Sequence, residues 1–203
     1  EDWPEVSETM MTLVSVFVAV DLETVPAETV EERLRELLAR EDWFAAPLPG
    51  ARTLWHVPTV YGTDLAPQLE EAAEVAGLDP NEAIRQLSSA RVRVLTLGFA
   101  PGQPYLGELP KVWDIPRQQG LTKSVPRGAL VTAIRQLIIF TGPTPTGWRH
   151  VGQTAFRNFN QRAAIPFALS PGDELVFPAI ERAAFDTLTA SESYGAADRE
   201  AIA

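Results

Sequence analysis

The sequence contains no cysteine, and that absence removes disulfides, thiolate metal sites and cysteine nucleophiles. It also has no run of roughly 18 apolar residues, so we expect no membrane-spanning helix and no membrane partner. Walker A, Gly-x-Gly-x-x-Gly and Gly-x-Ser-x-Gly motifs are missing, which leaves phosphate-loop and serine-elbow chemistry unsupported. The lack of cysteine fits a reducing compartment, and we expect a cytoplasmic protein.

Histidine is scarce, with only His56 and His150 in 203 residues. A zinc site needs about three or four clustered ligands, so the sequence predicts no metal site. Each histidine is more often structural than catalytic, but His150 is the better catalytic candidate because Arg149 and Gly152 flank it in a basic segment. Asp114 is the second catalytic candidate, since nearby cations would hold its carboxylate ionised.

Charge is distributed unevenly along the chain. The formal net charge is −10, which argues against a nucleic-acid partner because phosphate neutralisation needs a basic surface. Residues 1–90 carry −13, residues 91–168 carry +8 and residues 169–203 carry −5. This layout fits either separate solvated surfaces of opposite charge or a site for a small anionic ligand built on the middle segment.

The first 90 residues combine strand and helix patterns. Leu13–Val20 is β-branched and apolar and predicts a buried strand, and an apolar stripe after Pro26 predicts a helix. A short strand over 56–61 and a helix over 65–76 follow. Asp79 before Pro80 marks the N-cap of a further helix.

From Arg91 onward, short strand patterns alternate with Gly/Pro turns, which is typical of a β-barrel or sandwich. We therefore expect an α+β chain. Its small α/β N-terminal domain would cover residues 1–90, with a truncated start because the chain opens on Glu1 rather than Met. A β-barrel domain would cover 91–188, and residues 189–203 would form a polar tail that is frayed or weakly helical.

Several turns in the basic segment carry arginine side chains. They are Pro116-Arg117, Pro126-Arg127-Gly128 and Gly147-Trp148-Arg149-His150. Fixed backbone beside cationic groups is how proteins hold a carboxylate or a phosphate. These turns favour the anionic-ligand interpretation of the charge.

Taken in order, the motifs of this chain resemble the PxpB/KipI family of 5-oxoprolinase subunits, also called allophanate hydrolase subunit 1 or the carboxyltransferase C/D-type domain. The resemblance runs from about Val57 to Ile180 and marks a divergent member. Its main segments are Val57–Gly62, Leu97–Gly107, Val125–Gly128, Val151–Thr154 and Ser170–Asp173.

The resemblance implies a small α/β N-terminal domain followed by a cyclophilin-like β-barrel domain. It also implies a PxpC/KipA-like partner and a LamB/YcsF-like third subunit. Such complexes are ATP-dependent 5-oxoprolinases, hydrolases that open the pyroglutamate lactam, with ATP acting at the level of the complex. The alternative is a non-catalytic regulatory or interaction module of the KipI type, similar to the relative that inhibits a histidine kinase. Prolyl isomerase activity would rest on fold analogy alone.

This sequence departs from the family pattern where a site is expected. The family usually has Phe where Gln103 stands and a Gly-rich turn where this chain reads Ile134-Arg135. The scaffold is therefore kept while the pocket is rewritten. We expect the substrate-binding residues to be Tyr105, Arg117, Arg127, Gln136, Trp148, Arg149 and Gln153.

Overall fold

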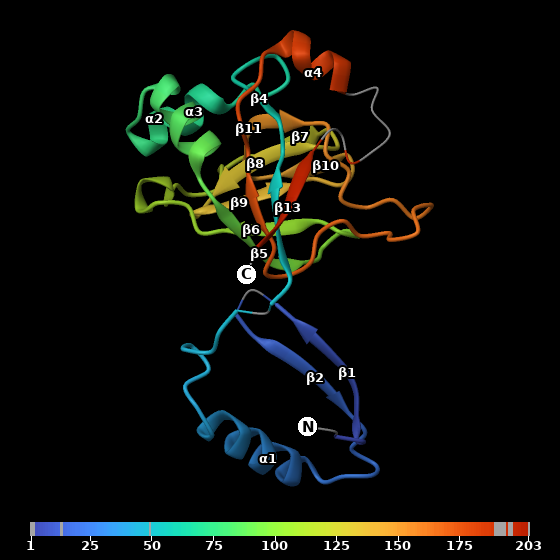
Figure 1. Ribbon diagram of the computed structural model, residues 1–203. Helices are drawn as coiled ribbons and strands as arrows, with labels where there is room; N and C mark the ends of the chain where they lie inside the picture. The colour runs from blue at the N-terminus through green and yellow to red at the C-terminus, as the bar shows by residue number, and fades with distance from the viewer. Residues whose placement is uncertain (1–2, 13, 49, 189–193, 195–196, 203) are drawn as a thin grey trace. The chain divides into compact units, whose positions relative to one another are not determined.

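The computed structural model describes residues 3–12, 14–48, 50–188, 194 and 197–202. The chain divides into two compact units, Glu1–Pro49 and Gly50–Ala203 (Figure 1). Among the described residues, no helix is both long enough and apolar enough to cross a bilayer.

The first unit holds a two-stranded antiparallel sheet and one helix. Strand β1 (Val6–Met11) pairs with β2 (Val16–Val20), and α1 (Ala27–Ala39) follows. The helix after Pro26 is confirmed. Most of the strand expected over 13–20 also forms, but the prediction that it is buried is wrong, because the residues of β2 are exposed or half-buried; Leu13 lies outside the described residues. Strand β1 was not anticipated, because its sequence VSETMM is not alternately apolar.

The second unit is mixed α/β, and its main sheet curls into a half-barrel (Figure 1). The sheet has nine strands in the order β13-β3-β12-β5-β6-β9-β8-β11-β4. They are β3 (Arg52–His56), β4 (Thr59–Tyr61), β5 (Val92–Leu97), β6 (Pro104–Gly107), β8 (Ala129–Ala133), β9 (Gln136–Ile139), β11 (Arg149–Thr154), β12 (Glu174–Val176) and β13 (Asp198–Ile202).

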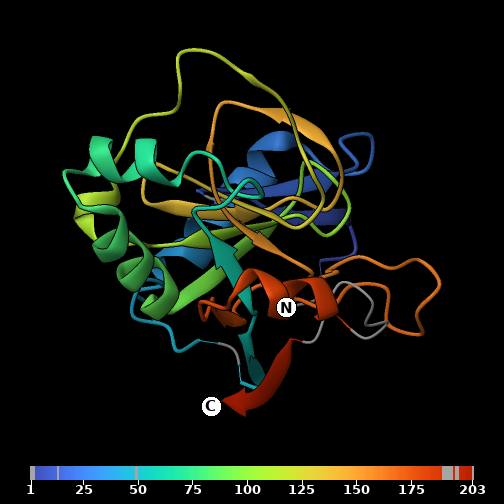
Figure 2. The same cartoon turned by 90° about the horizontal axis from the view of Figure 1, so that it is seen from above.

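A separate ribbon and short helices complete this unit. Strand β7 (Thr122–Val125) pairs with β10 (Thr144–Thr146) outside the main sheet. The helices are α2 (Leu69–Ala76), α3 (Pro80–Ser89), the 3-10 turn η1 (Lys111–Trp113) and α4 (Arg182–Leu188). Figures 1 and 2 show α2 and α3 together at one side of the sheet, with the orange loop that follows β11 at the other.

The chain divides between Pro49 and Gly50, whereas the sequence predicted a domain boundary at residue 90. Strand β4 pairs with β11 and β3 pairs with β12, so the segment from residue 50 onward belongs to the curled sheet. The end of the tail is also different, because residues 198–202 form β13 against β3 and are not frayed or helical. Residues 189–193, 195–196 and 203 lie outside the described part.

Two apolar clusters lie on opposite faces of the sheet. In β8, Leu130 belongs to the cluster that includes α2 and α3, whereas Ala129, Val131 and Ala133 belong to a second cluster. This alternation is the ordinary period of a strand buried on both faces. The second cluster contains Val125, Ala129, Val131, Ala133, Ile138, Phe140 and Trp148, with Tyr105 packed against it.

Candidate functional site

Strands β6, β9, β8 and β11 are neighbours in the sheet, and the second cluster lies on their face turned away from α2 and α3. We call this surface the site face. Backbone register pairs Tyr105 with Ile138, Ile138 with Val131, and Val131 with His150, which places the four side chains in one row. With strands about 4.8 Å apart, the row is roughly 14 Å long, a length suited to a small ligand.

A β-bulge brings His150 and Gln153 to the same face. Residues three apart on a regular strand point to opposite faces. The register between β11 and β8 shifts between His150 and Gly152, so Gln153 lies opposite Ala129 of the second cluster. The bulge therefore gathers two polar side chains that the alternation would otherwise separate.

The amide of Gln153 is held in one orientation. Its Nε2 donates to the carbonyl oxygens of Arg127 at 2.9 Å and of Thr154 at 3.0 Å. Gln153 is 5% exposed, and its buried Oε1 has no hydrogen-bond partner among the described residues. Gln153 Oε1 is therefore a hydrogen-bond acceptor on the site face whose orientation is fixed by the bonds of Nε2.

Hydrogen bonds hold the backbone of His150, while one of its two ring nitrogens has no partner in the described part of the chain. Its N–H donates to Oε1 of Gln68 at 2.9 Å, and its carbonyl accepts from the Gln68 N–H at 3.0 Å. The residue is 4% exposed, and its buried Nε2 has no partner among the described residues. Burial lowers the pKa of His150, against smaller raising contributions from hydrogen bonding to the Gly152 backbone and the Gln153 side chain. The imidazole is therefore neutral at neutral pH.

We expect acid to destabilise the protein through His150. Because its folded-state pKa lies below the unfolded value of about 6.5, the unfolded chain binds more protons as the pH falls through that value. The free energy of unfolding should therefore fall between pH 7 and 5, as measured by urea denaturation. His150→Gln should flatten this dependence, and Gln119→Leu, at an exposed and uncharged position, should not. Equal slopes for the native chain and His150→Gln would contradict the assignment.

Two further glutamines carry unpartnered oxygens. Gln136 begins β9 and shares the face of Ile138, and its buried Oε1 has no partner among the described residues. Gln103 is 1% exposed, and its buried Oε1 also has no hydrogen-bond partner among the described residues. It stands immediately before β6, two positions before Tyr105. Gln103 was not among the expected site residues. The signal was available, because a polar residue stands where the family usually has Phe.

Trp148 and Tyr105, both expected at the site, lie at the site face, Trp148 as a cluster member and Tyr105 packed against it. The guanidinium of Arg117, an exposed residue, lies 5.3 Å from the Trp148 ring centroid in a cation–π contact. Arg127 is exposed as well, and its carbonyl is the group that binds Gln153. These two arginines supply cations beside the site face.

Arg149 is placed elsewhere. Its side chain is 8% exposed, with Nε 2.9 Å from Oε1 of Glu71 and an Nη atom 2.6 Å from the Pro116 carbonyl oxygen. It therefore links β11 to α2 on the opposite face from His150. Asp114 is exposed beside the 3-10 turn, and nothing in the described structure brings it to the site face.

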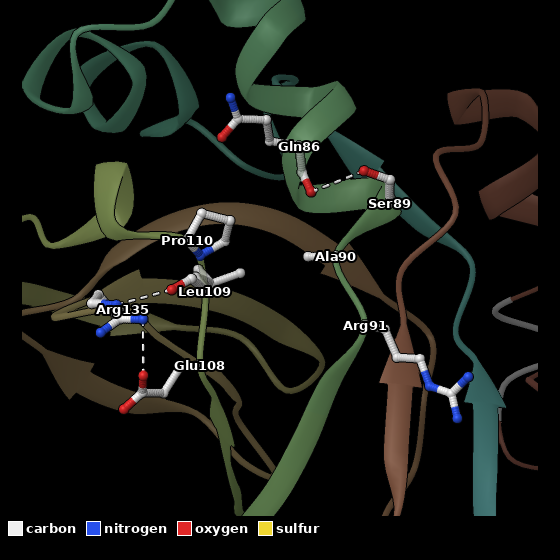
Figure 3. Close-up of a pocket in the computed structure, with 8 residues that line it drawn as sticks. All are labelled: Gln86, Ser89, Ala90, Arg91, Glu108, Leu109, Pro110 and Arg135. Atoms are coloured by element: carbon white, nitrogen blue, oxygen red, sulfur yellow. Dashed lines mark hydrogen bonds and ion pairs between the residues drawn. The ribbon is translucent and has the colours of Figure 1, made fainter. Parts of the chain in front are cut away.

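A groove with a volume of about 390 Å³ lies between the end of α3 and the segment after β6 (Figure 3). Its charged end is an ion pair of 2.8 Å between Arg135 and Glu108, and Arg135 Nε also donates to the Leu109 carbonyl at 3.0 Å. Figure 3 shows the Arg91 side chain directed away from Pro110. These groups are already satisfied, so the groove is a weaker candidate than the site face.

No group of three or more His, Asp or Glu side chains that could hold a metal ion occurs within the described ranges. The site face itself presents neutral groups, namely amides, an imidazole and a phenol. Its chemistry is therefore hydrogen bonding to a small polar molecule, with cations only at the margin.

Comparison with known proteins places this chain among related sequences. It is 34% identical over 148 residues to the B-type subunit of 5-oxoprolinase from Bacillus subtilis (strain 168), covering 73% of this chain and 59% of that protein. It is 35% identical over 121 residues to the corresponding 5-oxoprolinase subunit from Escherichia coli O157:H7, covering 60% and 56%. The chain thus spans less than two thirds of the length of these relatives.

Solved structures share the fold. A conserved uncharacterized protein from Pyrococcus horikoshii is 29% identical with a TM-score of 0.61, over 88% of this chain and 81% of that one. The urea amidolyase of K. lactis has a TM-score of 0.78 over 98% of this chain and 14% of that one, and at 17% identity it supports the fold alone. A family model described as the carboxyltransferase domain, subdomain C and D, matches residues 1–169. The chain therefore belongs to the carboxyltransferase subdomain C and D family, which is the PxpB/KipI family its motifs resemble.

Proposed function

We propose that this chain acts as one subunit of a hetero-oligomeric, ATP-dependent 5-oxoprolinase-type hydrolase with a PxpC/KipA-like partner and a LamB/YcsF-like third subunit. The names of the curated relatives support the type of complex. The proposal takes the curled sheet as the cyclophilin-like domain of the family and the cytoplasm as its compartment. The chain has no Walker A motif, so nucleotide binding is assigned to the complex and not to this chain.

The observation that carries the proposal is the set of unpartnered polar atoms on the site face. Nε2 of His150 and Oε1 of Gln153, Gln136 and Gln103 are buried without a hydrogen-bond partner among the described residues. Leaving a buried polar group unpaired costs about 1–3 kcal/mol, so a face with several such groups is suited to a ligand that pairs with them. A lactam offers a carbonyl and an N–H for this purpose.

A carboxylate on the substrate requires a cation. Arg127 is the first candidate, because its backbone carbonyl lies beside the open amide and accepts from Gln153 Nε2 at 2.9 Å. Arg117 over Trp148 is the second. We assign the small anionic substrate a neutral amide end on the site face and a charged end at these exposed arginines.

Reconstitution tests this function. The chain is combined with the two partner subunits encoded in the same genome, and glutamate released from 5-oxoproline is measured with and without ATP. We expect release only when all three subunits and ATP are present. A complete, folded complex without turnover would remove the proposed activity. Partner binding without turnover would favour the regulatory module.

A further inference from the structure

Gln68 stands immediately before α2, at the position where a side chain usually caps the helix. Its side chain makes no capping bond and reaches β11 instead, where Oε1 accepts from the His150 N–H at 2.9 Å. The Gln68 N–H donates to the His150 carbonyl at 3.0 Å. One residue at the start of α2 thus binds both backbone groups of His150.

These bonds take the place of a strand partner that β11 lacks at His150. Strand β4 pairs with Gly152, Gln153 and Thr154 of β11 and does not extend to His150. The N–H and C=O of one residue in a strand point to the same side, so both groups of His150 need partners beyond the end of β4. His150 is buried, and buried backbone groups without partners are strongly destabilising. Gln68 satisfies both groups.

Gln118 holds the two residues before Arg149 in a similar way. Its N–H donates to the Gly147 carbonyl at 2.7 Å, and its Nε2 donates to the Trp148 carbonyl at 2.8 Å. Its Oε1 accepts from Gln68 Nε2 at 2.8 Å, which joins the two glutamines. The Thr122 hydroxyl closes the network, because it accepts from Gln118 Nε2 at 3.3 Å and donates to Gln68 Oε1 at 3.4 Å.

This network acts on two residues of the site face. Trp148 belongs to the second apolar cluster, and His150 lies opposite Val131 of the same cluster. The direction of a side chain on a strand follows from the orientation of its backbone groups. We propose that Gln68 and Gln118 are positioning residues, which direct the His150 and Trp148 side chains to the site face by holding their backbone groups. The use of that face rests on the proposed function, whereas the positioning rests on the hydrogen bonds.

NMR spectroscopy tests the positioning on the chain itself. With ¹⁵N-labelled histidine, the ring nitrogens of His56 and His150 are observed, and His56→Phe assigns them. Gln68→Met keeps the length of the side chain but removes both hydrogen-bonding groups. We expect the pKa of His150 to rise toward its ordinary value of about 6.5, because a loosened strand gives water access to the ring. An unchanged titration of His150 in the folded variant would overturn the proposal.

Gln86→Met is the matched control. Gln86 is half-buried like Gln68, and its side chain also joins two groups, since Oε1 accepts from Trp113 Nε1 at 3.0 Å and Nε2 donates to Glu82 at 2.6 Å. Its loss should lower the stability by a comparable amount and leave the titration of His150 unchanged. Equal shifts in the two variants would assign the effect to a general loss of stability and would also overturn the proposal.

Gln118→Met is the second variant and keeps the proposal testable if Gln68→Met does not fold. It leaves the bonds between Gln68 and His150 in place and removes the bond to the Trp148 carbonyl. The indole N–H signal of Trp148, assigned with Trp148→Phe, should shift more than the His150 ring signals. An unchanged Trp148 signal would contradict the role of Gln118.

The reconstituted complex separates this inference from the proposed function. With all three subunits and ATP present, Gln68→Met should lower kcat for glutamate release about tenfold, the factor that a lost hydrogen bond of about 1.4 kcal/mol produces. Gln86→Met should keep a rate near that of the native complex. An inactive native complex, with the His150 titration shifted by Gln68→Met in the chain alone, would remove the proposed function and leave the positioning. An active complex in which both variants keep the native rate would remove the positioning role alone.

Discussion

Gly128→Ala should lower the free energy of unfolding by about 4 kcal/mol, a large part of the stability of a domain this size. Gly128 has a φ of +81°, a left-handed conformation that costs about 1–2 kcal/mol for a residue with a side chain. An added Cβ would also lie far inside van der Waals contact with the Thr154 carbonyl oxygen and 2.9 Å from Gln153 Nε2. Overpacking of this kind costs about 1–3 kcal/mol more.

The backbone around Gly128 cannot move freely to relieve the contact. The Gly128 N–H donates to the Phe140 carbonyl at 2.7 Å, and the Gly128 carbonyl accepts from the Thr154 N–H at 2.9 Å and from its Oγ1 at 3.0 Å. A shift would break these bonds and displace Gln153.

Gly77→Ala is the matched control. Gly77 ends α2 with a φ of +70°, but an added Cβ there would meet no atom within 4 Å. Urea denaturation should show a loss of about 1 kcal/mol, from the left-handed backbone alone. Equal losses for Gly77→Ala and Gly128→Ala would mean that backbone strain, and not contact with Thr154, sets the requirement at Gly128.

Local signals in the sequence predicted local structure well. The N-cap of α3 is one case, since Asp79 Oδ1 accepts from the N–H groups of Asn81 and Glu82 at 3.0 Å. The strands β8, β9 and β11 are another, because each has a Gly or Pro turn next to one of its ends. These features depend on residues within a few positions of one another.

Features that depend on pairing between distant segments could not be predicted from local sequence signals. Arg149 and His150 were expected to act together, but adjacent residues on a strand face opposite sides, and only the pairing of β11 with α2 and β8 shows which side each takes. The association of His150 with Gln153 depends on a bulge that nothing in the local sequence announces.

The turn between β8 and β9 is another feature that depends on a distant segment and not on its own residues. Ile134 and Arg135 have φ values of 45° and 62°, a conformation that favours glycine. Ile134 N–H donates to the Ile115 carbonyl at 2.8 Å and Arg135 N–H to the Trp113 carbonyl at 3.0 Å. The neighbouring segment thus holds the backbone where the family usually has a Gly-rich turn, so the turn survives without glycine.

Glu174→Gln should lower the free energy of unfolding by about 3 kcal/mol. The Glu174 carboxylate is 11% exposed, and Oε1 accepts from Arg52 at 2.6 Å while Oε2 accepts from Arg91. Arg93 adds a third guanidinium, 3.9 Å from Oε1. Charge-assisted hydrogen bonds contribute about 1.5–3 kcal/mol each, and removing one partner of a buried ion pair costs about 3–5 kcal/mol. The half-exposed Arg91 and Arg93 regain water, which keeps the loss near the lower value.

The pH dependence of this loss separates the charge from the shape of the side chain. Burial raises the pKa of Glu174, but hydrogen bonds and charge from Arg91 and Arg52 outweigh it and lower the pKa below its usual value. A carboxylate with a lowered folded-state pKa stabilises the protein above its unfolded pKa, and that contribution is lost as the pH falls through the folded value. The difference between native chain and Glu174→Gln should therefore be full at pH 7 and shrink below about pH 4. Glu200→Gln, at a 62% exposed side chain facing His56, should change stability by less than about 0.5 kcal/mol. A pH-independent difference for Glu174→Gln would assign the effect to packing, since only the charged form is held by the three arginines.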